Sequence, residues 1–231
     1  MKEKLVVLGV GAHSDDLDFG AAGTFAKFAK EGADCYYLVC TDGSKGSRDP
    51  KMTPKRLAAI REKEQRTSAK LLGVKNVFFL KHKDGELVAD MKLKKEIVRY
   101  IRKLKPDIVV AQDPTYIFSD RFVNHTDHRA AGMSTIDAVF PAARNPMTFP
   151  ELSKEGLGVH RVKEIYLVNR TNPNYAVDIS KFVDLKVEVL SQHQSQGIGK
   201  NPGFVKEMAK EMGKKWKYNY AETFFRINFA I

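Results

Sequence analysis

Hydrophobic residues in the first 130 positions fall into short continuous runs that are separated by longer amphipathic stretches. The runs are rich in β-branched and aromatic residues, which is typical of buried strands, and they lie at 4–10, 33–41, 76–80 and 107–112. The stretches between them predict helices at 20–31, 54–72 and 92–104. Regular alternation of this kind predicts an α/β chain with a Rossmann-like three-layer fold and a mostly parallel sheet.

The second half of the chain continues the same pattern less regularly. A fourth helix is predicted to begin near His125, and later elements are predicted as a strand at 164–168, helices at 180–195 and 203–215, and a closing strand at 222–231. The Pro-rich loop at 140–153 has neither the length nor the composition of a domain linker. We therefore expect one domain over residues 1–231.

Clusters of polar residues follow the first four predicted strands, at 13–16, 41–46, 81–86 and 112–128. In open parallel α/β sheets, ligands bind at the carboxyl ends of the strands. The sequence therefore predicts a functional site at that edge of the sheet, and the clusters at 13–16 and 125–128 are expected to meet there.

These two clusters contain the groups that a catalytic metal site requires. The first reads His-Ser-Asp-Asp and the second reads His-Thr-Asp-His. Taken alone, the first cluster would suit a helix cap equally well. Together they supply two imidazoles and one carboxylate as ligands, which leaves one position for water or substrate and is the pattern of catalytic zinc. The same ligand set also occurs in non-haem iron oxygenases.

The groups left over after metal binding favour hydrolysis. With His13, His128 and one aspartate of the first cluster as ligands, the other aspartate is free to take a proton from a metal-bound water. His125 would then stabilise the oxyanion or protonate the leaving amine, and Asp127 would orient the His125 ring. An oxygenase would have no obvious use for the spare carboxylate and imidazole.

A series of motifs along the chain resembles the LmbE-like (PIG-L) family of de-N-acetylases. The segment 11–18, with the residues Gly23-Thr24 after it, resembles the Ala-His-Pro-Asp-Asp signature of that family. Further motifs follow in the same order: Thr41-Asp42-Gly43, Arg61 to Glu64, Leu72-Gly73-Val74, Asp84-Gly85, His125 to His128, Asp178-Ile179 and His193 to Gln196. The resemblance implies a hydrolase that removes the N-acetyl group from an N-acetylglucosamine-type sugar.

The resemblance also implies roles for individual residues. His13, Asp16 and His128 are the expected ligands of one Zn²⁺ per chain, Asp15 is the expected general base, and His125 is the expected charged partner of the tetrahedral intermediate. Three further residues are expected to contact the sugar: Arg61, Asp84 and His193. Family members often form trimers or hexamers, so a homo-oligomer is expected.

Two positions depart from the family pattern. Ser14 replaces the usual proline, which removes no ligand and no proton donor. Some members place a tyrosine that polarises the carbonyl where this chain has Val123, so the donor must come from elsewhere. Asn124, Tyr116 and His125 are the candidates.

Composition narrows the alternatives. The net charge of +11 could indicate nucleic-acid binding, but the lysines are spread over predicted helices rather than gathered in one patch. No apolar run is long enough to span a bilayer and no signal region precedes the first strand, so a cytoplasmic protein without a membrane span or nucleic-acid partner is expected. A two-metal phosphoesterase remains the main alternative enzyme, and an inert nucleic-acid-binding scaffold is the alternative from another class.

Overall fold

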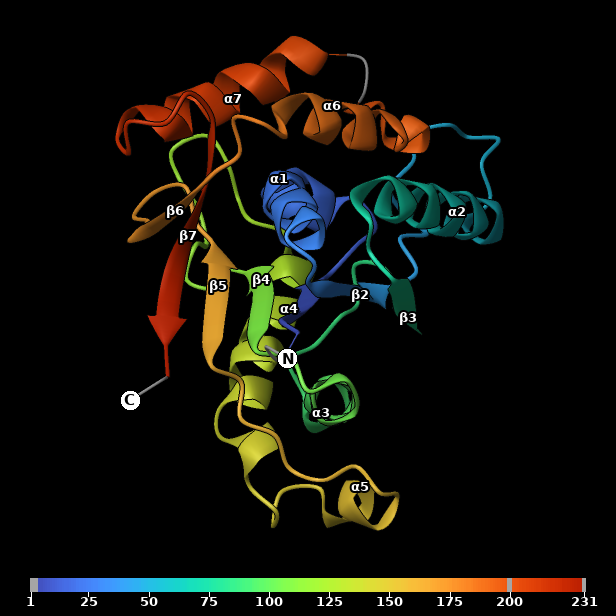
Figure 1. Cartoon of the computed structure of the whole chain (residues 1–231). Helices are drawn as coiled ribbons and strands as arrows, with labels where there is room; N and C mark the ends of the chain where they lie inside the picture. Colours follow the sequence, from blue (N-terminus) through green and yellow to red (C-terminus); the bar gives the residue numbers. More distant parts are fainter. Residues whose placement is uncertain (1–3, 199–200, 230–231) are drawn as a thin grey trace.

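A computed structural model describes residues 4–198 and 201–229 (Figure 1). Within these residues, seven strands form one sheet in the order β3-β2-β1-β4-β5-β7-β6. Neighbouring strands from β3 to β5 are parallel, whereas β7 is antiparallel to both β5 and β6. The strand bounds are β1 Val6–Gly11, β2 Asp34–Thr41, β3 Asn76–His82, β4 Ile108–Gln112, β5 Glu164–Val168, β6 Tyr175–Asp178 and β7 Ala221–Asn228.

Helices cover both faces of the sheet and make three layers (Figure 1). One face packs against α1, α2, α6 and α7, and the other packs against α3, α4 and the short α5. The helix bounds are α1 Asp16–Lys30, α2 Pro54–Leu72, α3 Met91–Leu104, α4 Thr126–Val139, α5 Pro150–Lys154, α6 Val183–Ser191 and α7 Pro202–Lys214, with short 3-10 turns at Ala142–Arg144 and Gln194–Gln196. The predicted three-layer α/β fold is confirmed.

Alternation along the strands accounts for the two cores. In β1, Val7 lies in the core under α1, and Leu8 and Val10 lie in the core under α3 and α4. Cys35 and Cys40 of β2 separate in the same way, as their odd spacing predicts, and both are free thiols. Hydrophobic side chains therefore leave both faces of the central strands, which is why these strands read as continuous apolar runs.

Several predicted elements differ from the structure at their ends. The first helix begins at Asp16 rather than at 20, because Asp16 and Asp18 suit the positive end of a helix dipole. The helix predicted at 180–195 is α6 over Val183–Ser191, followed by a 3-10 turn. The closing strand predicted at 222–231 is β7 over Ala221–Asn228, and residues 230–231 lie outside the described part.

The sequence pattern missed β6 and α5. Strand β6 is a four-residue edge strand that pairs only with β7, so it lacks the long apolar run of a central strand. Its pairing partner lies more than 40 positions later in the chain, where a local pattern cannot indicate it. Among the described helices, none combines the length and the apolar character needed to cross a membrane.

Candidate active site

A tight turn between β1 and α1 carries the first polar cluster. Asp15 occupies the helix N-cap position with a φ of 91°, a left-handed conformation that is costly for a residue with a side chain. Helix α2 supports this turn from one side: Gln65 Oε1 accepts the Asp15 main-chain N–H at 2.8 Å, and Arg61 Nη2 donates to the Ser14 carbonyl at 2.7 Å. The turn thus holds two adjacent carboxylates at the carboxyl end of β1.

The second polar cluster lies at the start of α4. His125 is the N-cap residue, and its Nδ1 accepts the main-chain N–H of Asp127 at 3.2 Å. His128 lies on the first turn of the helix, where its Nδ1 is 3.1 Å from Asn124 Oδ1. The Asn124 amide nitrogen donates to the Tyr116 carbonyl at 2.8 Å, so the amide oxygen faces His128. The His128 Nδ1 therefore carries the proton, and Nε2 presents a lone pair.

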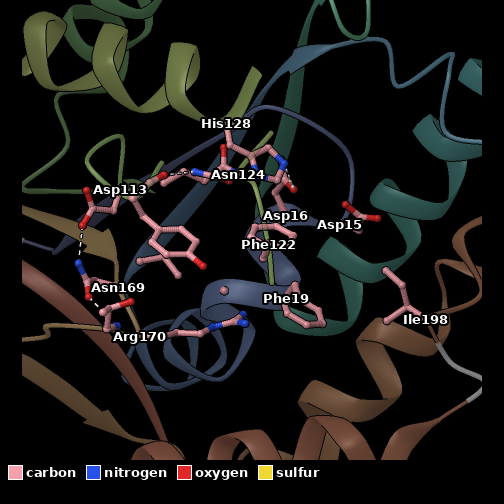
Figure 2. Close-up of a pocket in the computed structure, with 15 residues that line it drawn as sticks. Asp15, Asp16, Phe19, Asp113, Phe122, Asn124, His128, Asn169, Arg170 and Ile198 are labelled. Carbon is pink, nitrogen blue, oxygen red and sulfur yellow. Dashed lines mark hydrogen bonds and ion pairs between the residues drawn. The ribbon is translucent and has the colours of Figure 1, made fainter. Parts of the chain in front are cut away.

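The two clusters converge, as the topology predicts. His13 Nδ1 lies 3.2 Å from His128 Nε2 and 3.4 Å from Asp16 Oδ2, and His128 Nε2 lies 3.1 Å from Asp16 Oδ1. Figure 2 shows Asp16 and His128 side by side at one end of a cavity, with Asp15 next to them. The structure thus brings together the three side chains that were predicted as metal ligands.

The other edge of the His13 ring faces two more carboxylates. His13 Nε2 lies 3.2 Å from Asp84 Oδ1 and 3.2 Å from Asp127 Oδ2. Both carboxylates also accept main-chain N–H groups, Asp84 from Lys45 and Asp127 from residues 85 and 87. These contacts favour the tautomer that carries its proton on Nε2, so the lone pair of His13 lies on Nδ1 and points toward His128.

Ligand atoms from two overlapping sets lie within 4.8 Å of one another: His13, His125 and His128, and His13, Asp84, His125 and Asp127. The second set is less suited to hold an ion because main-chain N–H groups already occupy Asp84 and Asp127. Asp127 also lies nearer to His13 than to His125, whose Nδ1 is 4.0 Å from the carboxylate. The structure thus gives Asp127 a contact with His13 that the sequence did not predict.

Charges in this cluster shift the pKa values of its members. Burial alone would lower the pKa of His13, but Asp127, Asp16 and Asp84 outweigh it and raise the pKa to about 12. Burial alone would raise the pKa of Asp16, but His128 and His13 hold it well below its usual range. The carboxylates around His13 thus favour a positive charge at this position, which a second ring proton or a cation at Nδ1 would supply.

Asp15 has a different environment from its neighbour. Burial and the nearby Asp16 charge raise the pKa of Asp15 to about 6, although Arg61 opposes the shift. Asp15 and Asp16 therefore differ in proton affinity in the direction that separates a proton acceptor from a metal ligand. The pKa of His125 is lowered, first by burial and then by the His13 charge, so its surroundings oppose the positive charge that the family resemblance implies for His125.

The three residues that were predicted to contact sugar are not among those that line the cavity. Arg61 is buried and donates to the carbonyls of Ser14 and Gly43. Asp84 is buried against His13. His193 has no exposed surface, and its Nε2 lies 2.7 Å from Asp18 Oδ2. Arg61 contacts the β1–α1 turn, Asp84 contacts the His13 ring and His193 contacts Asp18 of α1.

The cavity beside the cluster has a volume of about 470 Å³. Its wall includes Asp15, Asp16 and His128, together with residues that sequence reasoning missed: Phe19, Asp113, Phe122, Asn169 and Arg170. Asp113 directly follows β4 and Asn169 directly follows β5, so the rule that ligands bind at the carboxyl ends of strands could have indicated them. Figure 2 shows Asp113 hydrogen-bonded to Asn169 on the wall away from His128.

Of the three residues considered as substitutes for the missing tyrosine, Tyr116 faces the cavity with a free donor. Its ring stacks on Phe122 at 6.1 Å, and within residues 4–198 and 201–229 its hydroxyl has no hydrogen-bond partner. Asn124 also lines the cavity, but both polar atoms of its amide are engaged by Tyr116 and His128. Val123 itself is 70% exposed.

Comparison with known proteins identifies the family. The model of the PIG-L family, described as GlcNAc-PI de-N-acetylase, matches residues 8–139. A diacetylchitobiose deacetylase from Thermococcus kodakarensis is 37% identical over 190 residues, which cover 82% of this chain and 69% of that protein. A probable N-acetyl-α-D-glucosaminyl L-malate deacetylase from Bacillus anthracis is 26% identical, over 85% of this chain and 83% of that protein.

A solved structure agrees with these matches over almost the whole chain. The N,N'-diacetylchitobiose deacetylase from Pyrococcus horikoshii, solved with an inhibitor, has a TM-score of 0.90 and 32% sequence identity. The alignment covers 98% of this chain and 85% of that one. This chain therefore belongs to the PIG-L (LmbE-like) family of N-acetylglucosamine de-N-acetylases, which are amidohydrolases.

Proposed function

We propose that this chain is a zinc-dependent deacetylase that removes the acetyl group from an N-acetylglucosamine-type sugar, with His13, Asp16 and His128 as the metal ligands. The observation that carries the proposal is the convergence of His13 Nδ1, His128 Nε2 and the Asp16 carboxylate within 3.4 Å of one another beside a cavity.

The donor set fits a metal cation. The contacts with Asp84 and Asp127 leave the lone pair of His13 on Nδ1, and the contact with Asn124 leaves that of His128 on Nε2. These two nitrogens face each other at 3.2 Å, so two lone pairs and a carboxylate point at one place. Such an arrangement is repulsive unless a proton or a metal cation lies between the groups, and nitrogen and oxygen ligands of this kind suit Zn²⁺.

A zinc ion bound there would polarise the substrate carbonyl as a Lewis acid and would lower the pKa of a water molecule to roughly 7. Asp15 would complete the activation of that water by accepting its proton, since its pKa of about 6 is close to neutral pH. The same carboxyl group, once protonated, can return the proton to the leaving amine. Asp127 and Asp84 would keep the His13 ring in its ligand orientation.

His125 would stabilise the negative charge that develops on the carbonyl oxygen. Its Nδ1 accepts a main-chain N–H, so its Nε2 carries the proton and is available as a donor. Its ring lies 4.8 Å from that of His13 and 5.3 Å from that of His128, beside the ligand atoms. Tyr116 is the second donor in this proposal, because its hydroxyl has no partner within the described residues and it lines the cavity.

The cavity supports a sugar as the substrate. Its volume of about 470 Å³ is in the range of small-molecule sites, and Phe19, Tyr116 and Phe122 offer aromatic surface for a sugar ring. Asp113 and Asn169 add a carboxylate and an amide to the wall, hydrogen-bonded to each other and to residues 115, 171 and 172. The diacetylchitobiose deacetylase and the probable N-acetyl-α-D-glucosaminyl L-malate deacetylase act, by their names, on diacetylchitobiose and on an N-acetylglucosaminyl malate, so N-acetylglucosamine with a further substituent is the expected substrate class.

The test is acetate release from a panel of substrates: N-acetylglucosamine, diacetylchitobiose and N-acetylglucosaminyl conjugates that carry an anionic group. Zinc content is measured on the same sample before and after chelation. We expect acetate release from at least one member, loss of activity on chelation, and recovery at one zinc ion per chain.

Hydrolysis of a phosphate ester with two metal ions per chain would contradict the proposal and would support a phosphoesterase instead. A panel of phosphate monoesters and diesters is therefore assayed in parallel. A chain that releases acetate equally well after complete chelation would contradict the metal requirement.

A further inference from the structure

Two buried charged side chains contact the backbone of α1 near its middle. Lys186 comes from α6 and Glu222 comes from β7, and their side chains are only 2% and 3% exposed. Their Nζ and Oε1 atoms lie 2.5 Å apart. Removing two charges from water costs several kcal/mol per ion, so a pair of this kind persists only where further hydrogen bonds satisfy it.

Helix α1 supplies those hydrogen bonds from its own backbone. Glu222 accepts the main-chain N–H of Gly23 at 3.0 Å, and it accepts both the N–H and the hydroxyl of Thr24, at 2.7 and 2.6 Å. Lys186 donates to the main-chain carbonyl of Phe19 at 2.7 Å. In a regular α-helix the N–H of Gly23 bonds to the carbonyl of Phe19. Both ends of that helical bond are therefore in contact with the ion pair.

Glycines on α1 let the surrounding elements come close enough for this contact. A Cβ atom on Gly23 would lie 2.7 Å from Ile179, and one on Gly20 would lie 2.9 Å from Val168. Any other residue at these positions would push α1 away from β5 and from the segment that follows β6. The sequence of α1 thus permits the ion pair to reach the helix backbone.

The part of α1 that the ion pair contacts, from Phe19 to Thr24, directly adjoins the proposed metal site. Phe19, whose carbonyl Lys186 holds, lines the cavity together with Gly20, and Asp16 lies one turn earlier on the same helix. We propose that Lys186 and Glu222 are positioning residues that fix the first turn of α1, and with it the Asp16 carboxylate, relative to His13 and His128. The ligand role of Asp16 in this inference rests on the proposed function.

The direct test is the zinc dissociation constant of the metal-free protein, measured by competition with a chromophoric chelator. The main variant is the double substitution Lys186→Met with Glu222→Gln, which removes the ion pair without leaving a single buried charge. A zinc affinity weaker by about tenfold is expected, the lower end of the effect of residues that hydrogen-bond to metal ligands, because this pair contacts the helix that carries Asp16 and not the Asp16 carboxylate itself. The constant is measured at a temperature at which each variant is fully folded.

A milder variant keeps the test decisive if the double variant does not fold. Thr24→Val removes only the hydroxyl hydrogen bond to Glu222 and preserves the shape of the side chain. We expect a smaller but measurable loss of zinc affinity and of kcat, with an unchanged far-UV circular dichroism spectrum.

The control is Glu164→Gln, which breaks the ion pair between Glu164 and Arg226 at 2.5 Å. Arg226 contacts β5 and β6 and has no role at α1, so this variant should lower the melting temperature and leave the zinc dissociation constant unchanged. If the folded Lys186→Met/Glu222→Gln and Thr24→Val variants bound zinc as tightly as the wild type does, the ion pair would stabilise the fold only, and this inference would be overturned. A wild-type chain that bound no zinc would instead overturn the proposed function, and this inference with it.

Discussion

Arg61 supports the β1–α1 turn rather than facing the cavity. Its guanidinium donates to the Ser14 and Gly43 carbonyls and lies 3.5 Å from the Asp15 carboxylate. Arg61→Ala should therefore lower kcat by about 10- to 100-fold while KM stays within about twofold. The substitution displaces the Asp15 base and leaves the residues that bind the substrate unchanged.

Steady-state kinetics of Arg61→Ala and of Arg56→Ala check this expectation. Arg56 is an exposed residue on the same helix, and its replacement should leave both constants unchanged. A raised KM with a normal kcat would contradict this expectation and would support the direct sugar contact that the sequence motif predicts for Arg61.

Tyr116 provides a second residue-scale prediction. Tyr116→Phe removes the hydroxyl and leaves the ring stacked on Phe122, so binding by the aromatic wall should persist. Loss of one donor to a developing oxyanion lowers kcat by about 100-fold or more in other hydrolases, and a fall of at least tenfold is expected here. Phe122→Leu is the matched control, because it disturbs the stack without removing a donor. Wild-type kcat in Tyr116→Phe would exclude Tyr116 as the carbonyl polariser.

The sequence indicated which residues gather at the site better than it indicated what each one contacts. His13, Asp16 and His128 lie in two short motifs whose convergence follows from the sheet topology. The partner of His193 is Asp18, which lies 175 positions away, and no local pattern indicates such a contact. Buried partners of this kind depend on how α1, α2 and α6 pack. A sequence motif therefore does not distinguish a residue that contacts sugar from one that forms an internal ion pair.

At the scale of elements, the His193–Asp18 pair ties the end of α6 to α1. Burial alone would lower the pKa of His193, but the Asp18 carboxylate outweighs it and raises the pKa. The contribution of the His193–Asp18 pair to the free energy of unfolding is therefore fully present below pH 6.5, the ordinary pKa of histidine in the unfolded chain. It is lost as the pH rises through the pKa of His193 in the folded protein. His193→Gln should lower the free energy of unfolding by about 2 kcal/mol at acid pH and by less at alkaline pH.

Denaturant unfolding of the metal-free protein across a pH series measures this difference. His160→Gln is the control: its pKa is lowered by burial, so the protonated form is disfavoured in the folded state and the pH trend should be opposite. A constant difference between wild type and His193→Gln at all pH values would contradict the ion-pair account.

Element boundaries followed the sequence where local chemistry marks them. For α2, Thr53 accepts the Arg56 main-chain N–H, Pro54 begins the helix and Gly73 ends it with a φ of 78°, and the predicted and observed bounds are identical. α6 has no side-chain cap at its start, and the 3-10 turn after it continues the helical pattern, so its predicted bounds were too wide. β6 depends on pairing with a strand far along the chain and has no such local signal.

At the scale of the whole molecule, the topology explains why motifs more than 100 positions apart form one site. β1 lies between β2 and β4, so the loops after these strands meet at one edge of the sheet. The net charge of +11, unlike the sheet topology, does not indicate where the site lies. Many surface lysines pair with acidic neighbours, such as Lys94 with Asp137 and Lys95 with Glu151. A homo-oligomer, expected from the family resemblance, stays a prediction that light scattering can test.

The central claim assigns different roles to two adjacent carboxylates, and one experiment separates them: zinc content and kcat of Asp15→Asn and Asp16→Asn measured side by side. Asp15→Asn should retain one zinc ion per chain and lose about 100- to 10,000-fold in kcat, because it removes the base and spares the ligands. Asp16→Asn should lose zinc, because a neutral amide replaces a charged ligand. If Asp15→Asn lost the metal while Asp16→Asn kept it, the two roles would be exchanged. If both variants kept zinc and full activity, hydrolysis through a metal ligand at Asp16 and a base at Asp15 would be contradicted.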